Sequence, residues 1–286
     1  MKAPITYIND TEFISKARYL KISRRSMLRL VSEKTLKAPI IYINIAEVIN
    51  KERKIMWLQN FRDAFVLNFI KDDRWKYLTE GLYVTLLITA FAVLMGLFLG
   101  FIVAMIRSTY QNTGKLKFLN ALSVLYLTVI RGTPVLVQLM IIYYVIFSSG
   151  NVNKIIVAIL AFGINSGAYQ AEIFRAGINA VPKGQFEAGR SLGFNYYQTM
   201  GNIIMPQAFK NILPALGNEF IVLVKETSIA GYIALVDITK AGDIIRSRTY
   251  SAFMPLLAVA LIYLVIVMGL TYLINLLERW LRRSAR

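Results

Sequence analysis

Long stretches without a charged residue dominate the pattern along this chain. Two of them are uninterrupted, residues 82–106 and residues 249–277. Because about 20 helical residues cross a hydrocarbon core of about 30 Å, both are long enough to span a membrane. Three further stretches are apolar apart from a few charges. The pattern predicts an all-α integral membrane protein with about five spans, at about 81–107, 116–149, 155–178, 200–231 and 250–277.

Several charged residues fall inside these expected spans. A charged side chain that faces lipid at mid-depth is costly, so such residues normally lie near a helix end or face protein or a water-filled path. We therefore expect protein or water around five side chains: Arg131, Glu172, Glu219, Lys225 and Glu226.

The composition excludes several kinds of catalytic and metal site. The chain has neither histidine nor cysteine, which excludes Ser-His-Asp and Cys-His nucleophiles, His/Cys zinc sites, Fe-S clusters and disulfides. Its 33 Lys and Arg exceed its 16 Asp and Glu and give a net charge of +17. Nucleic-acid binding would gather basic residues beside exposed aromatics, but here long uncharged stretches separate them. We expect no catalytic residue, no metal or other cofactor bound by this chain, and no nucleic-acid partner.

The basic residues of the short connections predict the orientation. Five spans place the two chain ends on opposite sides of the membrane, and the positive-inside rule assigns the more basic connections to the cytoplasm. The C-terminus, with its basic tail at residues 279–286, is therefore expected to be cytoplasmic. The inside residues are then Arg107, Lys115, Lys117, Arg175, Lys183, Arg190, Lys210, Arg279, Arg282, Arg283 and Arg286, and the outside residues are Lys154, Lys225, Lys240, Arg246 and Arg248.

The first 55 residues differ from the rest. They hold 12 basic and 5 acidic residues and no apolar run long enough to span a membrane. Residues 2–9 recur as residues 37–44, but a repeat architecture needs about three or more units. We interpret residues 1–55 as a dispensable basic extension that is either disordered or not part of the functional chain. The functional chain then begins at Met56, and an amphipathic segment, residues 56–80, leads into the first span. The alternative is a working extension that lies on anionic lipid.

A short helix is predicted in the connection between the third and fourth spans. Phe186, Gly189, Arg190 and Gly193 have the i, i+3, i+4, i+7 spacing of one helical face. Gly193 suits a left-handed C-cap, and Pro206 disfavours continuation of a helix through it. A two-turn helix on the cytoplasmic side is suited to docking a partner.

This connection, residues 183–206, resembles the coupling loop of ABC importer permeases, and specifically of the polar amino acid permeases that include the histidine and glutamine systems. The signature of that family is Glu-Ala-Ala, three residues, Gly, nine residues, Ile, one residue and Leu-Pro. Here Gly189 replaces the second Ala and Met205 replaces Leu, with the spacing intact. The matching positions are Glu187, Ala188, Gly193, Ile203 and Pro206, and the segments 130–134, 165–169, 216–219 and 225–228 also resemble the amino acid subgroup.

The resemblance covers residues 56–286 and implies a type I importer fold, with a transmembrane permease domain at residues 81–278 and a cytoplasmic coupling helix. It implies a prokaryotic inner or plasma membrane, a second permease subunit (the same chain or a sister chain), and an extracytoplasmic binding protein that delivers a polar L-amino acid. ATPase subunits that use ATP and Mg²⁺ are expected to be separate, because this chain has no Gly-rich sequence ending in Gly-Lys-Ser or Gly-Lys-Thr. The expected ATPase contacts are Glu187, Ala188, Gly189, Arg190, Leu192, Gly193 and Pro206.

Transport by alternating access needs a path at mid-membrane, and broken helices with polar groups build such paths. Gly132 and Pro134 are expected to interrupt the second span, and Pro214 with Gly217 the fourth.

Polar residues near these breaks are the candidates for the path. Asn165, Tyr169 and Glu172 lie at i, i+4 and i+7, on one face of the third span. The candidates are Arg131, Thr133, Asn165, Tyr169, Glu172, Asn218 and Glu219.

Alternatives remain for the charged candidates. In one alternative, Glu172 or Glu219 supplies an anion for a positive group of the substrate. In the other, each pairs with a nearby cation of the chain: Glu172 with Arg175 or Lys183, and Glu219 with Lys225. Arg131 would contact a substrate carboxylate or hold helix-end carbonyls. A second function, an ion-coupled secondary transporter or channel, would use the same buried acids, and uptake without any ATPase partner would favour it.

Overall fold

The computed structural model describes residues 39–148 and 152–283, and all regular elements in these ranges are helical. The chain divides into two units, Met1–Arg62 and Asp63–Arg286, and each is described separately. Most of the predicted extension, including the first copy of the repeat, lies outside the described residues. The expectation that the functional chain begins at Met56 stays a prediction.

Two short turns follow the first helix of the described residues. Helix α3 (Pro39–Phe65) is followed by a π-helical turn, η1 (Val66–Ile70), and a 3₁₀ turn, η2 (Lys71–Asp73). Asp72 and Asp73 both have positive φ, 57° and 52°, in the left-handed region that aspartate tolerates better than most residues. Helix α4 (Trp75–Thr113) begins directly after this turn.

The second expected span is broken. Helix α5 (Lys117–Gly132) is followed by α6 (Val135–Ile141) and the π turn η3 (Ile142–Ile146), and the two parts are bent by 107°. Thr133 is extended (φ −124°, ψ 146°), because the ring of Pro134 disfavours a helical residue before it. The predicted interruption at Gly132 and Pro134 is confirmed.

Helices α7 to α12 complete the chain. Helix α7 starts from an Asn153 side-chain cap, and α9 from a reciprocal capping box between Asn195 and Gln198. Gln198 is the third residue of α9, as that motif requires. The remaining bounds are α7 (Lys154–Asn179), α8 (Lys183–Ser191), α9 (Tyr196–Thr199), η4 (Met200–Ile204), α10 (Met205–Glu226), η5 (Thr227–Ile233), α11 (Ile238–Thr249) and α12 (Phe253–Arg283).

Two expected helix breaks do not occur. Helical structure continues through Pro206, because the π turn η4 precedes it and the Met205 N–H bonds to the carbonyl of Met200. Helix α10 also runs through Pro214. Gly217 lies where α10 meets α12, and an added Cβ would be 2.9 Å from Ile274 Cγ1. The small residue therefore serves close helix packing, and the predicted interruption of the fourth span is wrong.

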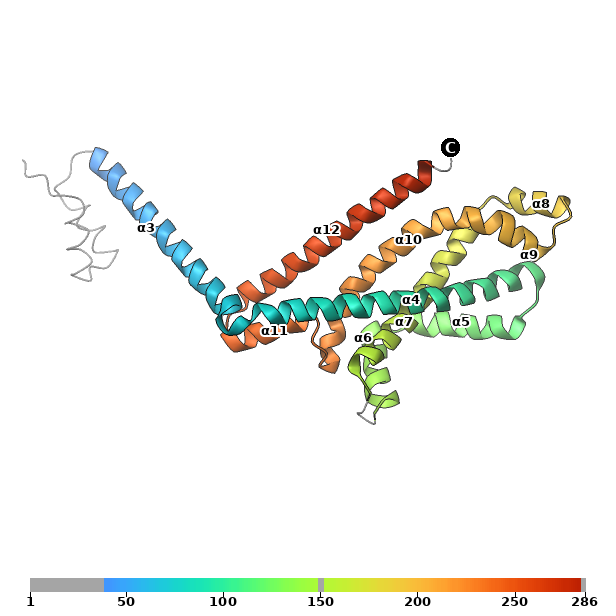
Figure 1. Cartoon of the computed structure of the whole chain (residues 1–286), viewed down its shortest axis with the longest axis horizontal. Coiled ribbons are helices and arrows are strands. Elements are labelled where there is room, and N and C mark those ends of the chain that lie inside the picture. The colour runs from blue at the N-terminus through green and yellow to red at the C-terminus, as the bar shows by residue number, and fades with distance from the viewer. Residues whose placement is uncertain (1–38, 149–151, 284–286) are drawn as a thin grey trace, which may run out of the picture. The chain divides into compact units, whose positions relative to one another are not determined.

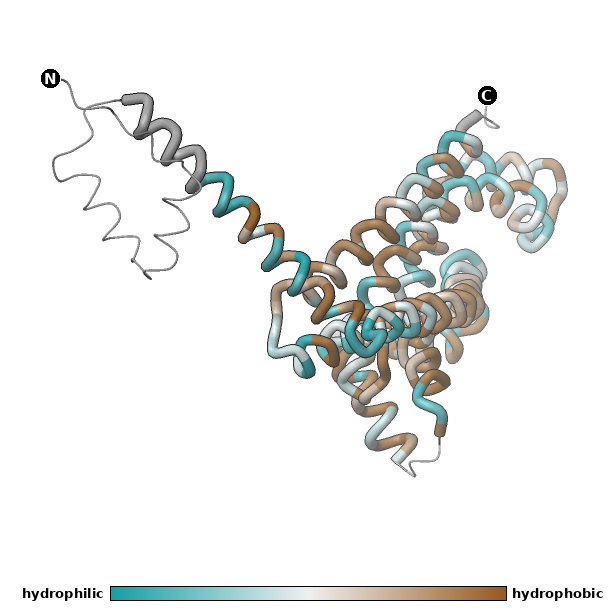
Figure 2. Tube along the Cα trace, turned by 60° about the vertical axis from the view of Figure 1, so that its left-hand side comes forward, coloured by the Kyte–Doolittle hydropathy of each residue, from teal (hydrophilic) through white to brown (hydrophobic). Residues whose placement is uncertain are grey.

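Helices α4 and α7 form the centre of the unit from Asp63 to Arg286 (Figure 1). Their backbones approach closely at Gly96 and Gly100, where an added Cβ would lie 2.7 Å from Gln170 Nε2 and 2.8 Å from the Ala171 nitrogen. The core around this contact includes the fully buried Ile88 and Phe162. Brown, hydrophobic positions recur along the long helices in Figure 2.

Helices able to cross a membrane are present, as the sequence predicted. Within the described residues, α4, α7 and α12 are long and apolar enough, and α5 with α6 and η3 makes a fourth if this bent pair is counted as one span. The all-α membrane fold is confirmed. Helix α10 carries the expected fourth span of the chain, and its membrane crossing stays a prediction.

Candidate functional site

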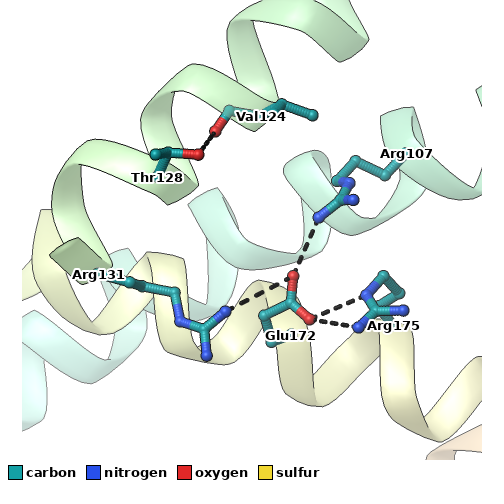
Figure 3. Close-up of polar contacts among 6 residues, drawn as sticks. All are labelled: Arg107, Val124, Thr128, Arg131, Glu172 and Arg175. Carbon is teal, nitrogen blue, oxygen red and sulfur yellow. Dashed lines mark hydrogen bonds and ion pairs between the residues drawn. The ribbon is translucent and has the colours of Figure 1, made fainter.

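Three arginines from three helices surround the carboxylate of Glu172 (Figure 3). Arg107 of α4 donates to Oε1 at 3.0 Å, and Arg175, one turn further along α7, donates to Oε2 at 2.6 and 2.9 Å. Arg131, at the end of α5, has its Nη1 3.9 Å from Oε1. The expected pairing of Glu172 with Arg175 is confirmed, and Glu172 also links α4, α5 and α7.

An open cavity of about 410 Å³ lies beside this cluster. Its polar wall comes from Arg107, Arg131, Glu172 and Thr128, and its apolar wall from α5. The hydroxyl of Thr128 bonds to the carbonyl of its own helix at Val124, 2.8 Å away (Figure 3). That bond leaves the arginines as the donors that face the cavity.

The cluster carries more positive than negative charge. Three guanidinium groups share one carboxylate, and the Nε of Arg107 is buried without a hydrogen-bond partner among the described residues. Arg131 also lies over the ring of Tyr169, 5.5 Å from its centroid, at cation–π distance. Because guanidinium groups match the geometry of a carboxylate, this cavity can bind a second carboxylate.

A separate hydrogen-bond network holds the break between α5 and α6. Gln138 Nε2 donates to the carbonyl of Ile130 (2.7 Å), and to the carbonyl and hydroxyl of Thr133 (3.1 and 2.7 Å). Its Oε1 accepts from Asn165 Nδ2 of α7 at 2.9 Å. Asn165 is 2% exposed, so its amide stabilises the break and is absent from the cavity wall.

The other predicted path residues lie in a different place. Ser166 of α7 donates to Glu219 of α10 at 3.2 Å, and Gln170 Nε2 donates to Ser166 at 2.9 Å. Asn218 is exposed. Among the ion pairs within residues 39–148 and 152–283, none joins Glu219 to Lys225, so that alternative is wrong.

The predicted residues thus form two groups. Arg131 and Glu172 line the cavity, and Tyr169 lies against Arg131. Thr133 and Asn165 belong to the adjoining network, whereas Asn218 and Glu219 lie on α10. Sequence reasoning did not assign Arg107 or Gln138 to a site. Nothing in local spacing joins Arg107 to a residue 65 positions away.

The predicted docking helix is α8, and one face of it packs on the chain. Gly189 is buried, and an added Cβ would be 2.7 Å from Thr199 Cγ2, which explains why glycine replaces the alanine of the signature. The Phe186 ring lies 5.9 Å from that of Tyr196. Arg190 Nη1 donates to the Phe194 carbonyl at 2.7 Å, and Gly193 has φ +85°. The left-handed C-cap is confirmed.

The other face of α8 is open to a partner. Glu187, Ala188 and Gly193 are exposed, and the side chain of Leu192, which follows the helix, is 76% exposed. Pro206 is also exposed, at the start of α10. These side chains are therefore accessible to a partner.

Comparison with known proteins identifies relatives of this arrangement. A profile described as "Binding-protein-dependent transport system inner membrane component" matches residues 96–283. A putative glutamine transport system permease protein of Rickettsia bellii is 37% identical over 213 residues, which cover 71% of this chain and 92% of that protein. An arginine transport system permease protein of Bacillus subtilis is 38% identical over 211 residues, covering 73% and 94%.

A solved structure has a similar fold. It is described as a crystal structure of an amino acid ABC transporter with histidines, and the matched chain is 42% identical with a TM-score of 0.68. The match covers 74% of this chain and 97% of that one.

Proposed function

Because the chain belongs to the family of binding-protein-dependent transport inner membrane components and is a polar amino acid ABC permease, we propose that it translocates polar L-amino acids by alternating access. An extracytoplasmic binding protein delivers the substrate, and a separate ATPase subunit supplies the energy. The chain is a multi-pass protein of a prokaryotic inner or plasma membrane with a cytoplasmic C-terminus.

The observation that carries this proposal is the two-sided geometry of α8. One face is held by Gly189 and Phe186 against the chain, so a force on the helix passes directly to α9 and to the turn η4 that leads into α10. The opposite face offers Glu187 and Leu192 to a groove on the ATPase. A helix that is packed on one side and free on the other can transmit closure of a partner to the membrane helices.

In this proposal the cavity at Glu172 lies on the substrate path. Arg131 and Arg107 present guanidinium groups to the substrate carboxylate, and Glu172 balances part of their charge and orients them. Glu219 on α10 supports a positive group of the substrate. Asn165 and Thr133 act indirectly, since they hold the break of the second span through Gln138.

The working complex needs partners. A second permease subunit, either the same chain or a sister chain, completes the path, and ATPase subunits bind ATP and Mg²⁺. This chain itself holds no cofactor in the proposed cycle.

Substitutions in α8 test the coupling. The permease with Glu187→Ala or Gly193→Asp is assembled with its ATPase and binding protein in liposomes, and amino acid uptake and ATP hydrolysis are measured together. We expect each variant to insert and to lose uptake for a given amount of ATP hydrolysed, because the contact at the free face is altered. Glu80→Ala, an exposed glutamate on α4, is the control. Normal coupled uptake by both α8 variants refutes the proposal.

The same liposomes separate this function from the alternative of an ion-coupled transporter or channel. An importer shows no uptake when the ATPase subunit is omitted. Uptake in its absence, driven by an imposed ion gradient, would establish the alternative.

A further inference from the structure

An exposed aromatic face runs along the last turns of α3. Lys54, Trp57, Leu58 and Phe61 have the i, i+3, i+4, i+7 spacing of one helical face. Trp57 is 61% exposed, Leu58 50% and Phe61 43%, and the rings of Trp57 and Phe61 stack with centroids 5.5 Å apart. We call Trp57, Leu58 and Phe61 the aromatic face.

Basic residues precede this face along the same helix. Lys54 and Lys51 lie one and two turns before Leu58 on the same side of α3, and Arg53 lies between them in the sequence. The opposite side carries the polar Glu52 and Gln59. In Figure 2, teal and brown positions alternate along the coloured part of α3. Tryptophan is enriched at the membrane–water interface, where its ring lies at the level of the headgroups.

The chain connection keeps this helix close to a membrane. The membrane-crossing helix α4 begins at Trp75, 14 residues after Phe61. Even fully extended, 14 residues reach at most about 50 Å, and the turns η1 and η2 shorten that reach. The chain therefore tethers the aromatic face to the membrane-crossing helix α4.

From this face, its lysines and its short connection to α4, we propose that α3 is an interfacial helix. Trp57 and Phe61 lie at the level of the lipid headgroups, Leu58 enters the acyl boundary, and Lys51, Arg53 and Lys54 contact lipid phosphates of an anionic bilayer. Indole rings favour this depth, because one edge is apolar and the N–H is polar. The inference is independent of transport and concerns only where α3 lies.

Fluorescence of single-tryptophan chains tests the proposal, since the chain has only Trp57, Trp75 and Trp280. The full chain with Trp75→Phe and Trp280→Phe is reconstituted into vesicles of phosphatidylcholine and phosphatidylglycerol whose acyl chains carry bromine near the headgroup. We expect the emission of Trp57 to be blue-shifted and quenched roughly twofold, as for a shallow interfacial residue. The chain that retains only Trp280 verifies insertion into the bilayer.

A matched control moves the indole to the polar side of the helix. In the Trp57→Phe, Gln59→Trp chain, also with Trp75→Phe and Trp280→Phe, the reporter lies on the side away from lipid and stays unquenched. Equal quenching of the two reporters overturns the proposal. A blue-shifted but unquenched Trp57 also overturns it, because a protein would then cover the face.

The lipid charge is tested separately. Lys51→Gln, Arg53→Gln and Lys54→Gln together are expected to reduce quenching of Trp57 in vesicles with phosphatidylglycerol and to have no effect in phosphatidylcholine alone. Quenching that is independent of phosphatidylglycerol overturns the assignment of an anionic lipid surface. A transport defect in the α8 variants, or its absence, has no bearing on this result.

Discussion

Replacement of Glu172 by glutamine removes the one negative charge that three arginines share. Glutamine has nearly the same volume and can still accept a hydrogen bond, so the packing of α7 is retained. Arg107 and Arg175 lose their charged partner, and the cavity wall gains a positive charge. We expect the permease to be destabilised where α4, α5 and α7 meet.

The expected loss of unfolding free energy depends on how exposed the charged side chains are and on their distances from Glu172. Glu172 and Arg107 side chains are 20% and 23% exposed, whereas Arg175 and Arg131 are 34% and 45% exposed. A hydrogen bond to a charged group contributes about 1.5–3 kcal/mol net when buried, and an exposed ion pair about 0–1 kcal/mol. The Arg107 contact lies between these limits, and the Arg131 contact at 3.9 Å contributes least. A loss of about 2–4 kcal/mol is therefore expected, with most of it from Arg107 and Arg175.

Thermal unfolding of the purified permease in detergent measures this loss. At about 2–4 °C per kcal/mol for a domain of this size, Glu172→Gln should lower Tm by about 5–15 °C. Glu80→Gln, the same change at an exposed position, should alter Tm by no more than about 2 °C. Arg107→Gln should lower the free energy of unfolding less in the Glu172→Gln background than in the native chain, because Arg107 has already lost its charged partner there. An unchanged Tm for Glu172→Gln, or additive effects of the two substitutions, would refute this reasoning.

Three further substitutions test other contacts. Gln138→Leu should lower the free energy of unfolding by about 1–3 kcal/mol, because the Ile130 and Thr133 carbonyls and the Asn165 amide lose their partner. Amide hydrogen exchange at residues 130–138 should become faster, and exchange at the native rate would contradict this prediction. Gly81→Ala should cost about 1–3 kcal/mol, because its Cβ would be 2.7 Å from the Asp237 carbonyl oxygen. Gly269→Ala, with open space around it, is the control, and equal Tm shifts for both would contradict the prediction. The carboxylate of Asp243 on α11, outside the candidate spans, bonds with Arg246 and Lys240, and these bonds hold its pKa below the usual 3.8. The contribution of Asp243 to stability is therefore complete above pH 3.8 and is lost as the pH falls through the lower pKa of the folded state. Asp243→Asn should make Tm fall less steeply with acidification in that pH range. An unaltered dependence of Tm on pH would exclude this role.

Much of the architecture was predictable from local patterns. Charge-free runs identified α4 and α12, since a helix must hide its backbone polar groups and expose apolar side chains in lipid. Pro134 identified the break in the second span, because proline restricts the residue before it. Gly193 identified the C-cap of α8. Each of these features depends on a few consecutive residues, so the sequence was sufficient to locate it.

Features that join distant residues were not predictable in this way. Pro206 and Pro214 have the same ring as Pro134, yet helical structure continues through both, because the π turn η4 and the surrounding packing accommodate them. Gly217 was expected at a break, whereas it allows α12 to pack closely. Spacing in the chain carries no information about which helix lies opposite, so the tertiary neighbour sets the role of such a residue.

In the candidate site, too, some features were predictable from local sequence and others depend on tertiary packing. Tyr169 and Glu172 share a face of α7 because helical periodicity places them there, and the sequence predicted that. The partners of Glu172 come from α4 and α5, and the bond between Asn165 and Gln138 joins α7 to α6. Local periodicity selects the face of a helix, but the packing of separate helices selects what that face meets. For this permease, the chain pattern therefore established the membrane helices and predicted a docking helix. The folded structure established the arginine cluster around Glu172, since its charges converge only when α4, α5 and α7 pack together.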